Sequence, residues 1–336
     1  MTDSNTRPAE CVVLSRRTLV SVGALAAFGF AVPALAQDKF PSRPIRLMCG
    51  SPAGSLSDIL ARFTAQKLGD ALRQSVVVDN KPGANGTLAA DVVAKAPADG
   101  YTLMLVPDTV MVVNQFVYPK LPYNSDAAFT SIAFLGRVAL LLVVNEKTGI
   151  KTMPEFLQKV KAQPGKLTYA SGGPGHPTHL IAELMANRLG LQIQHVPYKG
   201  TAPAIQAVAA GDVDAMIVGL AEAIPMIKAG KIRAIAASGP NAKEMYPELP
   251  LYKDFHKDLD STVWFGIFGP ANMPREVVTL LNSEINKVLS DPEAVRRFGE
   301  FGMKPLPSPP GAMDAIMNTE RASYGPLVKA LGLTSN

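Results

Sequence analysis

Short apolar and β-branched runs alternate along this chain with segments whose apolar positions repeat at helical spacing. The predicted strands are Ile45–Cys49, Ser75–Asp79, Tyr101–Val106, Ala139–Val144, Leu167–Ala170, Ile193–Val196, Val213–Val218, Ile232–Ala236 and Val263–Phe268. Several of these runs are apolar at every position. That pattern is typical of strands covered on both faces, as in a parallel sheet.

Apolar spacing of i, i+3, i+4 marks the predicted helices, because such positions share one helical face. The first clear stripe is Leu56, Ile59, Leu60 and Phe63, and the second is Leu180, Ile181, Leu184 and Met185. Further helices are predicted over Gly86–Ala96, Thr152–Ala162, Ala202–Ala210, Arg275–Ser290 and Gly311–Ala330. Strands that alternate with helices in this way predict an α/β fold with parallel sheets.

The first residues have the pattern of an export signal. The twin-arginine segment Ser15–Val20 precedes an apolar run that ends near Phe30, and Ala34-Leu35-Ala36 is a typical cleavage site. We therefore interpret residues 1–36 as a twin-arginine signal peptide, which implies a periplasmic protein. The alternative, a retained membrane anchor, is less favoured because glycines interrupt a run that is short for a bilayer.

The charge balance and the cysteine content limit which partners the protein can bind and what can stabilise its fold. Without residues 1–36 the chain has 30 basic and 26 acidic residues. This balance is mild and no Lys/Arg tract occurs, so we expect no nucleic-acid partner. Cys49 is then the one remaining cysteine, which excludes an internal disulfide. Stability must come from apolar cores, and roughly 300 residues are enough for two of them.

Two stretches repeat one design, in which a strand leads through a glycine-rich turn into a helix. Gly54 in the first stretch matches Gly175 in the second, and Ser57 matches Thr178. Glycine allows a ligand to approach the backbone, and a helix start attracts anions through its unpaired N–H groups. Two such starts that face each other would form a site for a small anion. Each turn taken alone is equally compatible with ordinary capping of a helix.

Many ordered segments resemble the Bug family of periplasmic solute-binding proteins, the receptors of tripartite tricarboxylate transporters. The resemblance covers almost all of Phe40–Leu333. The segments that carry it are Phe40–Ile45, Pro52–Gly54 with Asp58, Val76–Gly86, Ala98–Leu103, Lys120–Tyr123, Pro164–Ser171, His195–Gly200, Lys228–Ala234 and Trp264–Gly266.

The resemblance implies two α/β domains of the type II periplasmic-binding-protein fold that close on a ligand. Domain one would comprise residues 40–137 and 266–336, and domain two residues 138–265. Ala139–Val144 and Val263–Phe268 are the expected crossing strands at the hinge. The implied ligand is a small carboxylate, such as a di- or tricarboxylate, an aromatic acid or an acidic amino acid. The implied partners are membrane permease subunits, and we expect a monomer.

Four departures from the family pattern fall around the expected cleft, so they leave the identity of the ligand open. They are Gly50-Ser51 before the Pro-Ala-Gly motif, Ser55 in place of a second glycine, Pro107-Asp108-Thr109 after the third strand, and Gly219–Glu222 in place of an aspartate. Asp108 is unusual near an anion and hints at a ligand that also carries a cationic or hydroxyl group.

The predicted ligand-binding residues come from both helix starts and from neighbouring strand ends. They are Ala53, Gly54, Ser55, Ser57, Asp58, Asp108, Thr109, Ser171, Gly172, Gly175, His176, Thr178, His179, Tyr198 and Glu222. For Asp58, capping of the helix competes with ligand contact, and Tyr198 is as compatible with a buried structural ring. We expect the histidines at the second helix start to be neutral, because a helix N-terminus disfavours imidazolium.

Two alternatives stay open at this point. His176, His179 and His195 lie close in sequence, with Glu183 one turn beyond His179, and could form the zinc site of a periplasmic hydrolase. The spacing fits poorly across a helix cap, and no nucleophile elbow, P-loop or dinucleotide fingerprint occurs. We therefore predict no enzyme, no metal and no cofactor. The other alternative is a receptor that presents its ligand to a membrane sensor instead of a transporter.

Overall fold

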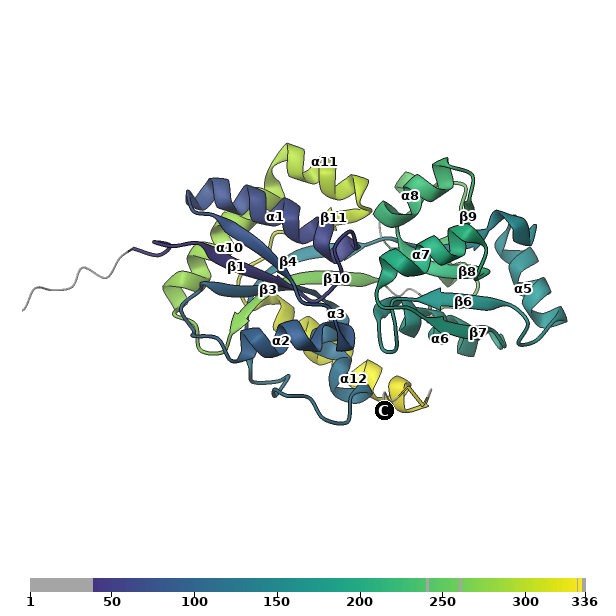
Figure 1. Ribbon diagram of the computed structural model, residues 1–336, viewed down its shortest axis with the longest axis horizontal. Helices are drawn as coiled ribbons and strands as arrows, with labels where there is room; N and C mark the ends of the chain where they lie inside the picture. The colour runs from purple at the N-terminus through teal and green to yellow at the C-terminus, as the bar shows by residue number, and fades with distance from the viewer. Residues whose placement is uncertain (1–38, 240–241, 260–261, 331, 334–336) are drawn as a thin grey trace, which may run out of the picture. The chain divides into compact units, whose positions relative to one another are not determined.

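The structure is a computed structural model that describes residues 39–239, 242–259, 262–330 and 332–333. The predicted signal peptide lies outside these residues. Two β-sheets organise the unit formed by residues 40–336 (Figure 1). No helix in the described part of the chain is long and apolar enough to span a membrane.

The first sheet has six strands. Their order is β11 (Met303–Pro305), β4 (Phe129–Val138), β10 (Val263–Pro270), β3 (Thr102–Pro107), β1 (Ile45–Cys49) and β2 (Val76–Asn80). Side chains that alternate along these strands enter two different cores. Leu47 packs on one face and Met48 on the other, and both are buried.

Helices cover both faces of the first sheet (Figure 1). The core that contains Leu47 is closed by α1 (Leu56–Leu72), α10 (Arg275–Ser290) and α11 (Pro292–Glu300). The core that contains Met48 is closed by α2 (Thr87–Ala94), α3 (Asp108–Val112), α4 (Asn114–Val117) and α12 (Ala312–Ala330). A single turn of 3₁₀ helix, Ala84–Gly86, precedes α2.

The second sheet has five strands. Their order is β7 (Gln194–Pro197), β6 (Thr168–Ser171), β8 (Ala215–Gly219), β5 (Leu140–Asn145) and β9 (Ile232–Ser238). Its helices are α5 (Met153–Ala162), α6 (Pro177–Leu189), α7 (Thr201–Ala210), α8 (Leu220–Lys228) and α9 (Ala242–Met245). The remaining 3₁₀ turns are Glu146–Thr148 and Tyr252–Asp254. We call each sheet with its helices the first half and the second half of the unit.

Neither sheet is fully parallel, so that part of the prediction is wrong. In the first sheet β10 runs antiparallel to β3 and β4. In the second sheet β5 runs antiparallel to β8 and β9. A central strand of a mixed sheet is covered on both faces just as a parallel strand is, and therefore its apolar run does not reveal its direction.

The chain passes between the sheets at the starts of the predicted crossing strands, not along them. β4 belongs to the first sheet and β5 to the second, with only Ala139 between them. The Ala139 amide donates to the Gly302 carbonyl at 2.7 Å. The return takes place before Val263, because β10 lies wholly in the first sheet. The proposed domain boundaries stay a prediction.

The predicted strands and helices occur within two residues of their expected positions, with two exceptions. The first helix continues to Leu72, and the helix around the stripe Leu180–Met185 extends from Pro177 to Leu189. The sequence reasoning missed β4, β11, α3, α4, α8, α9 and α11. β4 was missed because polar residues and Gly136 interrupt its apolar pattern, and α8 because Pro225 lies inside it.

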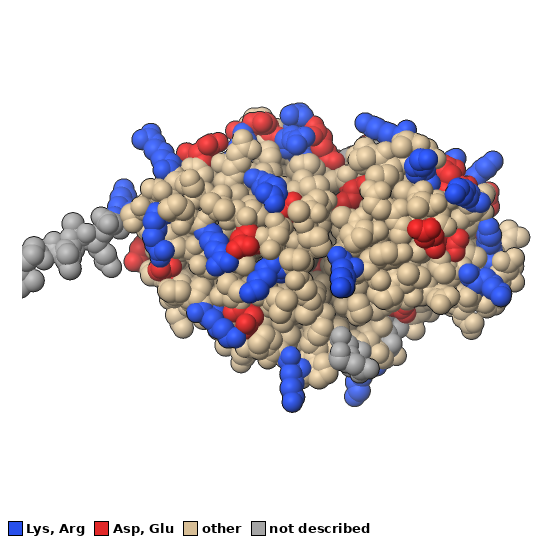
Figure 2. Space-filling view, viewed as in Figure 1, with Lys and Arg blue, Asp and Glu red and all other residues tan. Residues whose placement is uncertain are grey.

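Cys49, at the end of β1, is buried and free. Burial is the main reason that the pKa of its thiol is raised to about 11. The thiol is therefore protonated and unreactive at neutral pH. In Figure 2, basic and acidic side chains are both scattered over the viewed face, in keeping with the mild net charge.

Candidate functional site

A cavity of about 840 Å³ lies between the two halves of the unit. The first half contributes the start of α1, the turn before α2 and parts of β3, α3 and β10. The second half contributes the start of α6, the turn after β7 and the starts of α7 and α8. The two glycine-rich helix starts therefore line one cavity, which is the arrangement that a shared anion site requires.

Six of the predicted residues line this cavity. They are Ser57, Gly172, His176, Thr178, Tyr198 and Glu222. The structure does not bring the others to the cavity wall. They are Ala53, Gly54, Ser55, Asp58, Asp108, Thr109, Ser171, Gly175 and His179. Ligand contact stays a prediction for the whole set.

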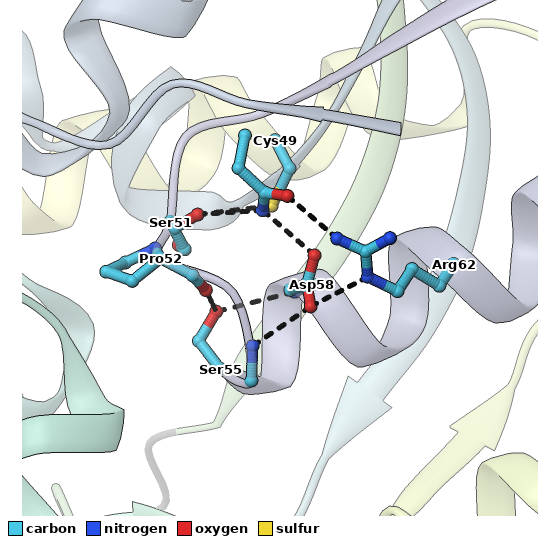
Figure 3. A network of polar contacts seen from close by, with 8 residues as sticks. Cys49, Ser51, Pro52, Ser55, Asp58 and Arg62 are labelled. Atoms are coloured by element: carbon cyan, nitrogen blue, oxygen red, sulfur yellow. Dashed lines mark hydrogen bonds and ion pairs between the residues drawn. The ribbon is translucent and has the colours of Figure 1, made fainter. Parts of the chain in front are cut away.

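The first turn is held by its own side chains (Figure 3). Ser55 caps α1: its hydroxyl accepts from the Asp58 amide at 3.4 Å and donates to the Pro52 carbonyl at 2.7 Å. The Ser55 hydroxyl is thus used inside the loop and is not aimed at the cavity. The Asp58 carboxylate accepts from the Gly54 amide at 3.0 Å, so Gly54 is also occupied.

Asp58 has a capping and bracing role in this structure. Its carboxylate accepts from Arg62 at 3.0 Å (Figure 3). It also accepts from Asn80 at 2.9 Å. Burial raises the pKa of Asp58, but the hydrogen bonds from Arg62, Gly54 and Asn80 outweigh it and leave the pKa lowered. The ionised carboxylate therefore fixes the turn against α1 and β2.

In the second turn, neutral histidines accept the amide hydrogens. Gly175 N–H donates to Nδ1 of His179 at 3.1 Å, and Thr178 N–H donates to Nδ1 of His176 at 3.3 Å. Gly173 N–H donates to the Ser171 hydroxyl at 3.1 Å. The Ser171 hydroxyl and the Gly175 amide therefore already have hydrogen-bond partners in this structure, and their contact with a ligand stays a prediction.

The ring of His179 stacks on that of His195, with centroids 4.0 Å apart, and Tyr169 stacks on His195 at 4.9 Å. Burial lowers the pKa of His176 to about 4, of His179 to about 3 and of His195 to about 4. The prediction of neutral histidines agrees with these pKa values. The main cause of the lowered pKa values is burial, however, and not the helix N-terminus.

The zinc alternative finds no support in the part of the chain that the structure describes. There, no group of three or more His, Cys, Asp or Glu side chains is arranged to hold a metal ion. The stacked rings of His179 and His195 use one nitrogen each in a hydrogen bond within the protein. Nδ1 of His179 faces the Gly175 amide, and Nε2 of His195 lies 2.6 Å from the Ser171 hydroxyl.

Asp108 does not line the cavity, and its contact with a ligand stays a prediction. It is buried, and its carboxylate accepts from the Thr109 amide at 2.7 Å. Burial, and then the nearby Glu320 carboxylate, raise the pKa of Asp108 well above its ordinary value. Asp108 belongs to the packing of α3 against α12, since α12 carries Glu320.

Glu222 reaches across the cavity from the second half to the first. Its Oε1 accepts from the Leu56 amide at the start of α1 at 3.0 Å, and also from the Thr201 hydroxyl. Burial raises the pKa of Glu222 to about 7, against the opposing hydrogen bonds from Thr201, Leu56 and Gly219. Glu222 is 9% exposed and lines the cavity.

Asn85 makes a second polar contact between the halves. Its side-chain amide donates to the Gly175 carbonyl at 2.9 Å and to Oδ1 of Asn114 at 2.7 Å. Asn85 has a φ of 49°, which suits asparagine better than most residues. The sequence reasoning missed Asn85 as a site residue, although the turn Lys81–Gly83 beside it was visible.

The sequence reasoning also missed Lys199, which is the only cationic side chain among the described residues of the cavity wall. It belongs to the segment His195–Gly200, so its position after a strand end was the available signal. Part of the cavity wall is apolar and includes Val110, Leu140, Val263 and Phe265.

Comparison with known proteins agrees with this geometry. A family model described as "Tripartite tricarboxylate transporter family receptor" matches residues 60–333. The chain is 31% identical over 319 residues to BugT of Bordetella pertussis, across 94% of this chain and 98% of that protein.

Two solved structures are also similar to this chain. A Rhodopseudomonas palustris protein with adipate has a TM-score of 0.84 and 30% identity, over 88% of this chain and 99% of that one. MatC from the same organism, with bound malate, has a TM-score of 0.80 and 27% identity, over 86% of this chain and 100% of that one.

Proposed function

We propose, because this chain belongs to the tripartite tricarboxylate transporter family of receptors, that it captures a small carboxylate in the cavity between its two halves. The family consists of periplasmic solute-binding receptors and not of enzymes. The convergence of both glycine-rich helix starts on one cavity carries the proposal. The similar proteins that bind adipate and malate support a carboxylate as the ligand class.

Lys199, Ser57 and Thr178 are the side chains that we assign to the carboxylate. All three line the cavity, and a charge-assisted hydrogen bond from an ammonium to a carboxylate is among the stronger ones. Gly172, His176 and Tyr198 complete the polar wall beside them. The apolar wall around Leu140 and Phe265 would receive the body of the ligand.

Ligand binding and closure would be linked. Because both halves line the cavity, a ligand that contacts both stabilises the closed arrangement over an open one. We assign delivery of the bound ligand to membrane permease subunits, and export of the chain to the twin-arginine route that Arg16-Arg17 indicates.

A thermal-shift panel tests the ligand class. Hexanoate, adipate, malate, benzoate and glutamate are added to the purified protein, and we expect at least one to raise Tm. A ligand at about a hundred times its Kd adds about 2.7 kcal/mol to the free energy of unfolding. If no carboxylate raises Tm or gives heat on titration, the proposal is wrong.

A matched pair of variants tests the site. Lys199→Gln should weaken binding of the best carboxylate by about tenfold, since it removes a charge-assisted hydrogen bond. Lys166→Gln removes the same charge from an exposed position and should leave the affinity unchanged. Equal affinity in both variants would place the carboxylate elsewhere.

A further inference from the structure

In the part of the wall that the structure describes, Glu222 is the one acidic side chain, and it occupies a position that an anionic ligand would otherwise take. The Leu56 amide is the first N–H of α1, and it already donates to Oε1 of Glu222. The Thr201 hydroxyl donates to the same oxygen. An internal carboxylate thus satisfies the start of α1.

The two charged side chains of the cavity wall differ in how far they are exposed to solvent. Of the lining residues, Lys199 alone carries a positive side chain and Glu222 alone a negative one. Lys199 is exposed, whereas Glu222 is buried. The groups that contact Glu222 are Leu56, Thr201 and Gly219, none of which is charged. The other titratable residues described in the wall are Tyr118, His176, Tyr198 and Lys199.

We propose that Glu222 is a specificity-determining residue that excludes a second carboxylate, so that the ligand of this receptor is a monocarboxylate with an apolar body. This inference rests on the proposed function and names its ligand class more narrowly. The single carboxylate is bound beside Lys199. The far end of the ligand lies against the apolar wall and meets Glu222 without a negative charge.

Electrostatics gives the reason. Two carboxylates that share a buried site cannot both stay ionised without a large penalty, because the low dielectric strengthens their repulsion. A ligand carboxylate at the start of α1 must also displace Glu222 from the Leu56 amide. An apolar ligand end neither repels the Glu222 carboxylate nor displaces it from the Leu56 amide. Its burial against Val110, Leu140 and Phe265 is also favourable.

Two pairs of ligands test the inference, because each pair differs only by the second carboxylate. They are hexanoate with adipate, and benzoate with terephthalate. Affinities are measured by calorimetry at pH 8, where Glu222 is ionised. We expect the monocarboxylate of the pair that binds to be favoured by about tenfold or more, the scale of one pKa unit of like-charge repulsion.

The variant Glu222→Gln removes the negative charge of the side chain but keeps its size and shape. Glutamine keeps an oxygen that can accept from Leu56 and Thr201, so the fold and the cavity should be preserved. The preference for the monocarboxylate should shrink by about tenfold, because the dicarboxylate no longer meets a negative charge at this position. Glu248→Gln, at an exposed position of the second half, is the control and should keep the preference.

Different outcomes overturn different statements. If carboxylates bind but the dicarboxylate binds as tightly as its partner, or if Glu222→Gln leaves the preference unchanged, the inference is wrong and the receptor function stands. If no carboxylate of the panel binds, the proposed function is wrong and the inference fails with it.

Discussion

The two glycine-rich helix starts look alike in sequence but are stabilised in different ways. At the start of α1, charged side chains brace the turn, and the first amide bonds to Glu222 from the other half. At the start of α6, the amides bond to neutral histidine rings and a serine within the same turn. The first amide of α1 thus depends on the second half, whereas the amides of the second turn bond within their own turn. The second turn still contacts the first half through the Gly175 carbonyl, which accepts from Asn85.

This difference shows that a glycine-rich turn at a helix start does not by itself make an anion-binding site. A helix start attracts a ligand only through N–H groups that have no partner. In the second turn, burial keeps His176 and His179 neutral. Each ring therefore accepts a hydrogen bond from a backbone amide, and that amide is no longer available to bind an anion. The polar contacts left for a ligand are then side chains such as Lys199 and Ser57.

The largest contrast should come from the matched glycines. A Cβ at Gly175 would lie 2.9 Å from Val117 of the other half, and the φ of Gly175 is 72°. Gly175→Val should separate the halves and weaken carboxylate binding by at least about a hundredfold, or about 2.7 kcal/mol. Calorimetry measures the loss.

Gly190→Val is the control for Gly175→Val. Gly190 has a similar φ of 62° but no atom within 4 Å of the added Cβ. The two variants share the strain of a left-handed residue, about 1–2 kcal/mol. Equal losses of affinity in both would show that contact between the halves at Gly175 does not matter.

The two turns should respond to acid in opposite directions. His179 and His195 have lowered pKa values, so the unfolded chain takes up protons below about pH 6.5 that the folded chain does not, and stability falls as the pH drops. Glu222 has a raised pKa, so the folded chain takes up its proton first. Its contribution to stability therefore rises as the pH falls from about 7 towards 4.5.

Variants can separate these two contributions. His179→Asn with His195→Gln keeps acceptor atoms near Nδ1 and Nε2 but removes both titrations. The loss of stability between pH 7 and pH 5, measured by urea unfolding, should shrink by about 1–2 kcal/mol. Glu222→Gln should enlarge that loss. A change of the same sign in both variants would contradict the opposite roles.

Asn85 joins the turn before α2 to the second glycine-rich turn, and its removal should have a moderate effect. Asn85→Gly keeps the positive φ but deletes the hydrogen bond to the Gly175 carbonyl. We expect carboxylate affinity to fall by about three- to tenfold, the value of one hydrogen bond. Asn272→Gly, at an exposed residue with a φ of 60°, should leave the affinity unchanged.

The smallest effect should occur at Gly54. Its φ is 81°, but no atom lies within 4 Å of an added Cβ. Gly54→Ala should therefore lower the free energy of unfolding by about 1–2 kcal/mol through backbone strain and change affinity by less than about twofold. A loss of binding as large as that of Gly175→Val would show that the first turn contacts the ligand closely.

The sequence predicted most of the architecture, because periodic apolar positions report burial directly. The strand Ile45–Cys49 and the helix Arg275–Ser290 lie where their patterns place them. The direction of β10 could not be predicted, since a buried strand has the same pattern in either direction. α8 was missed because its proline suggested a break.

The candidate site was predicted at the level of segments but not of atoms. The sequence located both helix starts, yet it could not show that Asp58 faces Arg62 and Asn80, or that Asp108 lies behind the cavity wall. These outcomes depend on side-chain direction and on contacts between segments far apart in the chain. Glu222 illustrates this best, because its partner Leu56 is 166 positions away.

Cys49 gives this receptor a practical use. Its thiol is buried and protonated, and residues 37–336 contain no other cysteine. A cysteine introduced at the rim of the cavity would therefore be the only reactive thiol of residues 37–336. An environment-sensitive fluorophore attached there would turn each capture event into an optical signal, and the native protein would need no prior removal of competing sulfhydryl groups.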